Sequence, residues 1–554
     1  MNFKFKIFIM PQLSEATKRL LLRYQTSLKA NQPIEGVSTI HVDEVASKVA
    51  AFYEKIRGII DWREEHLLKR AAIQRMLKRR FFVGIDLLKE ESTKETIAEP
   101  LVLELIRGGH YPNDKIPETK IIEVQKTIDK CIFILKNTPQ AESGQEALRF
   151  YNWFLSIAAC EIEEVLSSSY KERALIAYMY ESMKERIVLN EGAITIRPLK
   201  EEEKDIQIYI AVQKALFKLD APVISYHLLK HRCSGWESNN QREYLEIAKN
   251  MHSIKRKIER DLTHPLADKF YQICEKYDTP YLLLSDVLSE QKPEEISKKI
   301  SEPETIEGLI RNAYNKRLNT LQGRLYRAAF YSTLSVLLTN AVSVLILEIP
   351  LAKLIYGFFS KSPLLTISVD VLGPTVLMFL MVATIKPPSK NNLNIALIEA
   401  MKIIYQKEKT DVYEIRSNRQ KGFAMKSIIG FIYFFATLIS FGSIWWIFSL
   451  AKFPITSVFV NIIFVALIVF TGLAIKKRGE ELTIEERPPG LADFLFDILS
   501  LPIAGVGQWL SNKWKRYNII SAFFNALIDM PFMIFVEFVE QWRYFLKEKK
   551  EKIH

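Results

Sequence analysis

The pattern of apolar and polar positions changes near residue 328, where spaced apolar residues give way to long unbroken apolar runs. Four such runs follow, at residues 328–347, 364–385, 428–450 and 454–475. Each reaches the roughly 20 apolar residues that an α-helix needs to cross a hydrocarbon core of about 30 Å. The last two runs contain no charged side chain. The pattern predicts a polytopic membrane protein with four transmembrane helices.

Residues 1–327 follow a different pattern, in which apolar residues recur three and four positions apart, as along one face of an amphipathic helix. Asp220, two positions before Pro222, predicts a helix that starts at an N-cap followed by a first-turn proline. Residues 193–197 are the one short stretch that resembles a β-strand. We therefore expect residues 1–301 to form a cytosolic helical domain of one or two subdomains.

The remaining segments are basic or amphipathic. Residues 302–327 predict a basic juxtamembrane helix, and the basic loop 386–427 separates the second and third spans. The tail 476–554 contains two amphipathic stretches, 491–510 and 517–541, which predict an interfacial helical hairpin and a charged end. The alternative for these two stretches is a pair of further spans. The predicted fold is all-α: a large N-terminal cytosolic helical domain, a four-span transmembrane bundle and a C-terminal amphipathic hairpin.

The distribution of charge predicts the orientation. The formal net charge is +12, and basic clusters precede the first span, separate the second from the third and follow the fourth. The loops on the other side carry only Lys353, Lys361 and Lys452. Because positive residues favour the cytosolic side, we expect both termini in the cytosol and the plasma (inner) membrane as the location. The lysine-containing N-terminus lacks a signal-peptide core, which agrees with this expectation.

Basic and aromatic residues near the ends of the spans predict contacts with the membrane surface. Anionic lipid head groups are the expected partner, together with unidentified protein partners of the cytosolic domain. The predicted interface anchors are Arg324, Arg327, Trp509, Trp514 and Trp542. Basic runs elsewhere have acidic neighbours, so nucleic-acid binding is not expected.

Few residues suggest enzymatic chemistry. His227 and His231 are four positions apart with Cys233 nearby, a spacing that metal sites use, but no second ligand pair follows. The four cysteines lie far apart and predict reduced core residues rather than a cofactor site. No nucleotide-binding, hydrolase or kinase motif occurs. The sequence therefore supports neither an enzyme nor a cofactor.

Polar residues inside the apolar runs are the strongest functional candidates. Asn340, Asp370 and Asn461 lie within the first, second and fourth spans, and Glu348 follows the first span directly. A charged group inside a membrane is costly, so it usually faces a partner or water. The alternative for Asp370 is an anchoring role near the outer interface, paired with Lys353 or Lys361. Gly373 and Pro374 predict a possible break in the second span.

These observations give three hypotheses for the function. The first is a non-enzymatic, membrane-anchored scaffold or interaction protein with a large cytosolic helical domain. The second is a channel or transporter with a polar path in the first two spans, because Asn340, Glu348 and Asp370 lie there. The third is an enzyme at the membrane interface whose motif is not recognisable.

Overall fold

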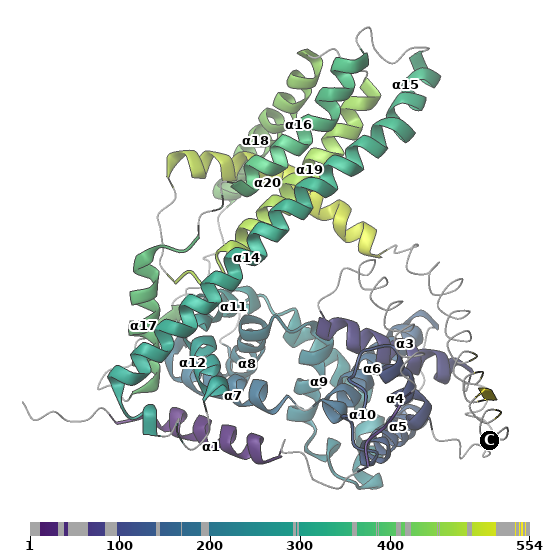
Figure 1. Ribbon diagram of the computed structural model, residues 1–554, viewed down its shortest axis with the longest axis vertical. Helices are drawn as coiled ribbons and strands as arrows, with labels where there is room; N and C mark the ends of the chain where they lie inside the picture. The colour runs from purple at the N-terminus through teal and green to yellow at the C-terminus, as the bar shows by residue number, and fades with distance from the viewer. Residues whose placement is uncertain are drawn as a thin grey trace, which may run out of the picture. The chain divides into compact units, whose positions relative to one another are not determined.

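The computed structural model is almost entirely helical, as the sequence predicts (Figure 1). The structure describes residues 12–30, 38–42, 65–83, 97–139, 144–167, 169–189, 199–291, 295, 298–356, 363–383, 385, 387–405, 412–415, 423–450, 453, 455–484, 490–516, 538, 542, 545–546 and 549. The chain divides into two compact units. The bundle unit comprises Met1–Leu21, Glu185–Pro198 and Lys276–Asn518, and the helical unit comprises Leu22–Lys184, Leu199–Glu275 and Ile519–His554. The domain boundary expected after residue 301 stays a prediction.

The helical unit packs around α6 (Gly144–Leu166), which contacts three other helices. Its inward face presents residues such as Phe154 and Ile157 to one continuous apolar core. The helices of this unit are α3 (Glu65–Val83), α4 (Ala98–Arg107), α5 (Thr119–Asn137), α6, α7 (Tyr170–Arg186, which continues into the bundle unit), α8 (Glu201–Phe217), α9 (Ala221–Arg232), α10 (Gln241–Leu262) and α11 (Ala267–Lys276), with a 3₁₀ turn at Ser234–Trp236. An apolar core of this extent explains why the seams in residues 1–301 follow helical spacing.

Local sequence signals in the helical unit behave as expected. Asp220 caps α9, because its side chain accepts a hydrogen bond of 3.4 Å from the backbone N–H of Val223. Cys131, Cys160 and Cys274 are buried, and they form no disulfide among the described residues. One charged pair lies inside this unit: Lys130 donates to Glu161, and its ammonium group lies 4.4 Å from the centre of the Trp236 ring.

The bundle unit contains the apolar helices and the elements at their base. Its helices are α12 (Asp278–Glu290), α14 (Pro303–Ser343), a π-turn η4 (Val344–Glu348), α15 (Ile349–Tyr356), α16 (Pro363–Ala383), α17 (Lys390–Ile404), α18 (Phe423–Leu450), α19 (Ile455–Gly479) and α20 (Leu491–Arg516). Helix α1 (Glu15–Ala30) begins in this unit. The strands β1 (Ile187–Leu189) and β2 (Tyr413–Ile415) pair in parallel. The sequence predicts neither strand, and the predicted strand at 193–197 lies outside the described residues.

Helix α14 is the longest element, with 41 residues (Figure 1). The juxtamembrane helix expected at 302–327 and the first predicted span form one continuous helix. Asn392 of α17 fixes the base of this helix, since its amide donates 2.9 Å to the Tyr314 hydroxyl and 2.6 Å to the Leu482 carbonyl. Its amide oxygen accepts 2.8 Å from the backbone N–H of Ile484. One fully bonded side chain thus joins α14, α17 and the segment after α19.

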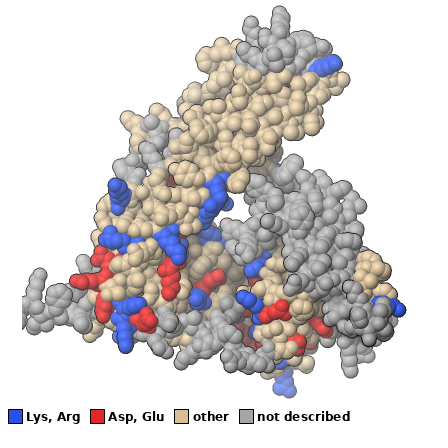
Figure 2. All heavy atoms as spheres, in the orientation of Figure 1, with Lys and Arg blue, Asp and Glu red and all other residues tan. Residues whose placement is uncertain are grey.

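Four described helices are long and apolar enough to cross a membrane, over Pro303–Ile346, Ala424–Leu450, Ser457–Gly479 and Phe494–Lys513. The first three correspond to the first, third and fourth predicted spans, with ends that differ by a few residues. The second predicted span forms α16, a helix of 21 residues whose apolar part, Ile367–Ala383, is shorter. In Figure 2 the surface of the bundle is tan along most of its length, and charged side chains concentrate towards its lower end. These features fit an integral membrane protein.

Helix α20 is the part of the tail that the structure describes, and it packs against α19 and α18. Its apolar composition would also let it span a membrane. Figure 1 shows its yellow C-terminal end projecting from the side of the bundle. The predicted second helix of the hairpin, 517–541, falls almost wholly outside the described residues. Whether α20 lies on the membrane surface therefore stays a prediction.

Candidate intramembrane site

Six polar side chains lie buried where α14, the π-turn, α16 and α19 pack together. We call them the intramembrane polar cluster. Their exposed fractions are Asn340 3%, Ser343 5%, Glu348 3%, Asp370 2%, Ser457 0% and Asn461 2%. In an apolar bundle, polar atoms this deeply buried cost stability unless they bind one another or a ligand.

Asp370 and Asn461 form the central contact of this cluster. The side-chain amide of Asn461 on α19 donates a hydrogen bond of 2.6 Å to one carboxyl oxygen of Asp370 on α16. The same amide donates 3.0 Å to the backbone carbonyl of Ser457, one turn earlier on α19. The described partner of Asp370 is therefore an amide on a neighbouring span, while Lys353 is exposed. Lys361, the other lysine considered for Asp370, lies outside the described residues.

Glu348 brings a second carboxyl group to the cluster. It lies close enough to interact with the carboxyl of Asp370 and with the hydroxyl of Ser457. The three side chains come from the π-turn, α16 and α19, so the site exists only when these elements are packed. Two carboxyl groups and a hydroxyl in one buried place form an oxygen-rich site of a kind that holds a proton or a small cation.

The π-turn explains how Glu348 reaches the cluster. In a regular α-helix a rotation of about 100° per residue would place Glu348 about 80° away from Asn340 around the axis. A π-turn contains more residues per turn, so Val344–Glu348 rotates less and moves Glu348 towards the face of Asn340. Such turns occur mostly as single insertions within α-helices and often at functional sites.

Several atoms of the cluster are buried without a hydrogen-bond partner among the described residues. They are both side-chain polar atoms of Asn340, Oγ of Ser343, Oε2 of Glu348, Oδ2 of Asp370 and Oγ of Ser457. Native interiors leave few such atoms, and each calls for an explanation such as a bound water or ion. The cluster therefore has free capacity to donate and accept hydrogen bonds.

Pro374 lies inside α16 without breaking it, and it leaves one backbone carbonyl oxygen of this helix without its usual hydrogen bond. The helix runs from Pro363 to Ala383, so the break expected at Gly373 and Pro374 is not found. Proline has no N–H, which leaves the carbonyl of Asp370, four positions earlier, without its usual helical donor. Position 370 thus offers both a carboxyl group and a main-chain oxygen.

The histidines that the sequence singles out lie against other side chains of the helical unit. Within the described residues no group of three His, Cys, Asp or Glu side chains is arranged to hold a metal ion. The ring of His227 binds the side-chain oxygen of Gln213, and burial lowers its pKa to about 4. His231 lies beside Tyr209 instead, with 6.1 Å between the ring centres. These side chains are part of the packing of the helical unit.

The predicted interface anchors are located as follows. Arg324 forms an ion pair of 3.3 Å with Glu481, and both residues lie in the bundle unit. Trp509 is exposed, with the ammonium group of Lys513 5.9 Å from its ring centre. Trp542 is also exposed. Arg327 lies on α14, and Trp514 lies on α20, although its side chain is outside the described part. Their contact with lipid stays a prediction.

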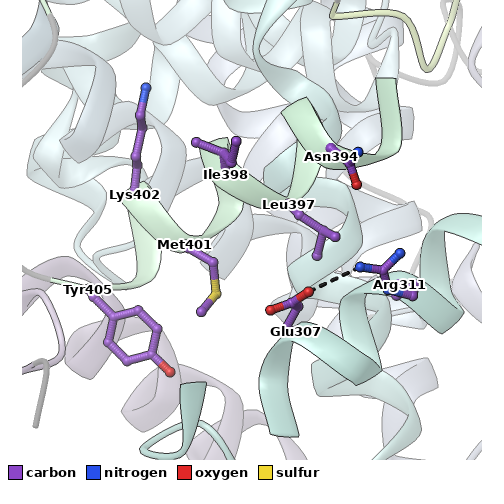
Figure 3. Close-up of a pocket in the computed structure, with 8 residues that line it drawn as sticks. All are labelled: Glu307, Arg311, Asn394, Leu397, Ile398, Met401, Lys402 and Tyr405. Carbon is purple, nitrogen blue, oxygen red and sulfur yellow. Dashed lines mark hydrogen bonds and ion pairs between the residues drawn. The ribbon is translucent and has the colours of Figure 1, made fainter. Parts of the chain in front are cut away.

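An open groove of about 500 Å³ lies between the N-terminal part of α14 and α17, outside the apolar spans (Figure 3). Glu307 and Arg311 on α14 form an ion pair of 3.1 Å at its edge. The residues from α17 and its C-cap are Asn394, Leu397, Ile398, Met401, Lys402 and Tyr405. The groove has an apolar floor and charged edges, which suits a peptide or lipid chain better than a small polar substrate.

No protein-family model matches the sequence, and no characterised protein or solved structure is significantly similar to it. The function must therefore be argued from the residues and their geometry.

Proposed function

We propose that this chain is an integral membrane transport protein whose ion-binding site is the intramembrane polar cluster. The observation that carries the proposal is the meeting of two buried carboxyl groups, Glu348 and Asp370, between α14, α16 and α19. A carboxyl group at membrane depth costs a few kcal/mol on insertion scales. A bundle that only anchored the protein would be more stable with apolar side chains at these positions.

The distribution of exposed apolar and buried polar side chains among the helices supports this proposal. Helix α18 exposes large apolar side chains such as Phe431 and Trp446, which suit contact with lipid. The polar cluster lies instead on α14, the π-turn, α16 and α19. Polar groups in transporters face the interior of the bundle in this way.

We also propose that the protein lies in a plasma (inner) membrane with both termini on the cytosolic side. Lys353 and Lys426 are exposed and lie near opposite ends of the spans, which makes them suitable positions for labelling. In a cysteine-free background, an impermeant thiol reagent applied to intact cells should label Lys353→Cys and leave Lys426→Cys unlabelled. Labelling of Lys426→Cys alone would reverse the orientation.

Flux through reconstituted protein tests the proposal itself. We expect liposomes that contain the full chain to take up an ion or solute from a panel of labelled candidates, and Asp370→Asn to abolish the uptake. Thr437→Val is the matched control, because Thr437 lies on α18 outside the polar cluster and its hydroxyl donates a hydrogen bond of 2.7 Å to the Tyr433 carbonyl of its own helix. Wild-type uptake by Asp370→Asn would contradict the proposal.

The groove between α14 and α17 favours a second function, that of a membrane-anchored scaffold. Ile398 is 57% exposed at this groove, so a partner that filled the groove would cover its apolar side chain. A photocrosslinking residue at position 398 should form one defined protein adduct in cells. The same residue at Ile122, an equally exposed position of the helical unit, is the control. Equal background at both positions would remove the support for a scaffold.

A further inference from the structure

We propose that Glu348 and Asp370 form one proton-binding site, so that the ion bound by the bundle is H⁺. The inference deepens the proposed transport function by naming its ion. It rests on the position of the two carboxyl groups, on the neighbours that surround them and on the unpaired atoms beside them.

The neighbours of the pair carry no positive charge. The side chains that contact it are Ser457 and Asn461 from α19, and both are neutral. Asn340 and Ser343, the buried polar residues of α14, are neutral as well. No ion pair of the described chain includes either carboxyl group, and the nearby Lys353 is exposed. A buried carboxylate without a cation beside it is strongly disfavoured in a low-dielectric interior.

Two neighbouring carboxylates that are buried in such surroundings cannot both be charged, because like charges repel and little water screens them. Two carboxyl groups that share one proton resolve the repulsion, as paired aspartates do in other proteins. The shared proton also provides the missing donor, since Oε2 of Glu348 and Oδ2 of Asp370 have no hydrogen-bond partner among the described residues. The proton belongs to the pair rather than to either residue.

The contact of Asn461 with Asp370 fits a proton better than a metal cation. The amide N–H group already occupies Oδ1 of Asp370 and directs a positive dipole into the site. A hard cation such as Ca²⁺ needs six or more oxygen ligands, and it would compete with this donor for the carboxyl group. A proton needs only the two facing oxygens.

Infrared spectroscopy of the full chain in nanodiscs tests this site without requiring transport. Exposed Asp and Glu, with pKa values of about 3.9 and 4.3, are ionised at pH 7. The C=O stretching band of a protonated carboxylic acid should therefore persist at pH 7 in the wild type. We expect the difference between the wild type and the Glu348→Gln/Asp370→Asn double variant to contain this band, and the difference between the wild type and Thr437→Val to lack it. Buried carboxyl groups elsewhere, such as that of Glu163 with its raised pKa, contribute equally to all three proteins and cancel.

If the double variant does not fold, selective ¹³C labelling of aspartate in the unmodified chain tests the pair through Asp370, because the label shifts only the band of protonated aspartate. The inference is overturned if the wild type and the double variant have the same protonated band at pH 7, if no aspartate band shifts in the labelled chain, or if Na⁺ or K⁺ removes the band of the pair at constant pH. A protonated pair in a protein without flux would contradict the transport function and leave the proton site standing. Flux without the protonated band would contradict the proton site and leave the transport function standing.

Discussion

Asn461 on α19 donates a hydrogen bond of 2.6 Å to Asp370 on α16, although 91 positions separate the two residues in the sequence. This bond joins the two helices at the point where Glu348 also contributes its carboxyl group. It gives the α16–α19 interface a polar contact at a place where apolar packing alone would not specify which residues meet. The stability of the bundle and its ion site therefore depend on the same side chain.

Replacement of Asn461 by Leu tests this contact. We expect a loss of about 1–2 kcal/mol in the free energy of unfolding, since polar contacts between membrane helices contribute about 0.6 kcal/mol on average and up to about 1.7. Unfolding by SDS in mixed micelles, followed by tryptophan fluorescence, measures the change. Thr437→Val should have less than half of this effect. Equal effects of the two substitutions would show that the Asn461–Asp370 bond has no special weight.

Gly507 gives a prediction for the packing of α20. A Cβ atom at this position would overlap the backbone carbonyl of Ala466 and approach the Phe470 side chain on α19. We expect Gly507→Ala to destabilise the bundle by about 1–3 kcal/mol, the usual cost of overpacking.

Gly442 on α18 is the control for this substitution, because a Cβ there meets no atom within 4 Å. Gly442→Ala should be neutral or stabilising, since alanine favours a helix by up to about 1 kcal/mol over glycine. The same SDS titration compares the two variants. A neutral Gly507→Ala would mean that α20 does not pack on α19 as described.

Glu163 in α6 predicts a pH-dependent stability of the helical unit. Burial raises the pKa of its carboxyl group to about 7, against the opposing charges of Arg70 and Lys69. The folded state therefore binds the proton more tightly than the unfolded state, and stability falls as pH rises from about 4.5 to about 7.

Glu163→Gln should remove most of this fall, which amounts to at most about 3 kcal/mol. Hydrogen exchange of α6 amides at pH 5.5 and pH 8, corrected for intrinsic rates, reports the difference. Glu246→Gln, at an exposed position of α10, should leave the pH dependence of the wild type in place. A fall in stability that persists in Glu163→Gln would exclude this carboxyl group as its source.

Much of the fold follows from periodicity. The unbroken apolar runs predict α18 and α19 because both helices consist almost wholly of apolar residues. Asp220 predicts the start of α9, since capping depends on adjacent residues. The parallel pairing of β1 with β2 could not be predicted, because each strand has only three residues and the pairing partner is distant in the sequence.

For the candidate site, the sequence identifies residues but not the contacts between them. Hydropathy alone singles out Asn340, Glu348, Asp370 and Asn461 as polar residues in or beside spans. It does not tell which of them meet, because that depends on helix rotation and on the π-turn at Val344–Glu348. The spacing of Ser457 and Asn461, one helical turn apart, is the signal that α19 also has a polar face.

Proton entry into liposomes tests the central claim most directly. Full-length protein is reconstituted with a pH-sensitive dye inside, and a K⁺ diffusion potential, negative inside, is imposed with and without each candidate solute. We predict internal acidification by the wild type and Thr437→Val, and at least a tenfold lower rate for Glu348→Gln and Asp370→Asn. The same acidification rate in all four proteins, or none in the wild type under any condition, would contradict the account.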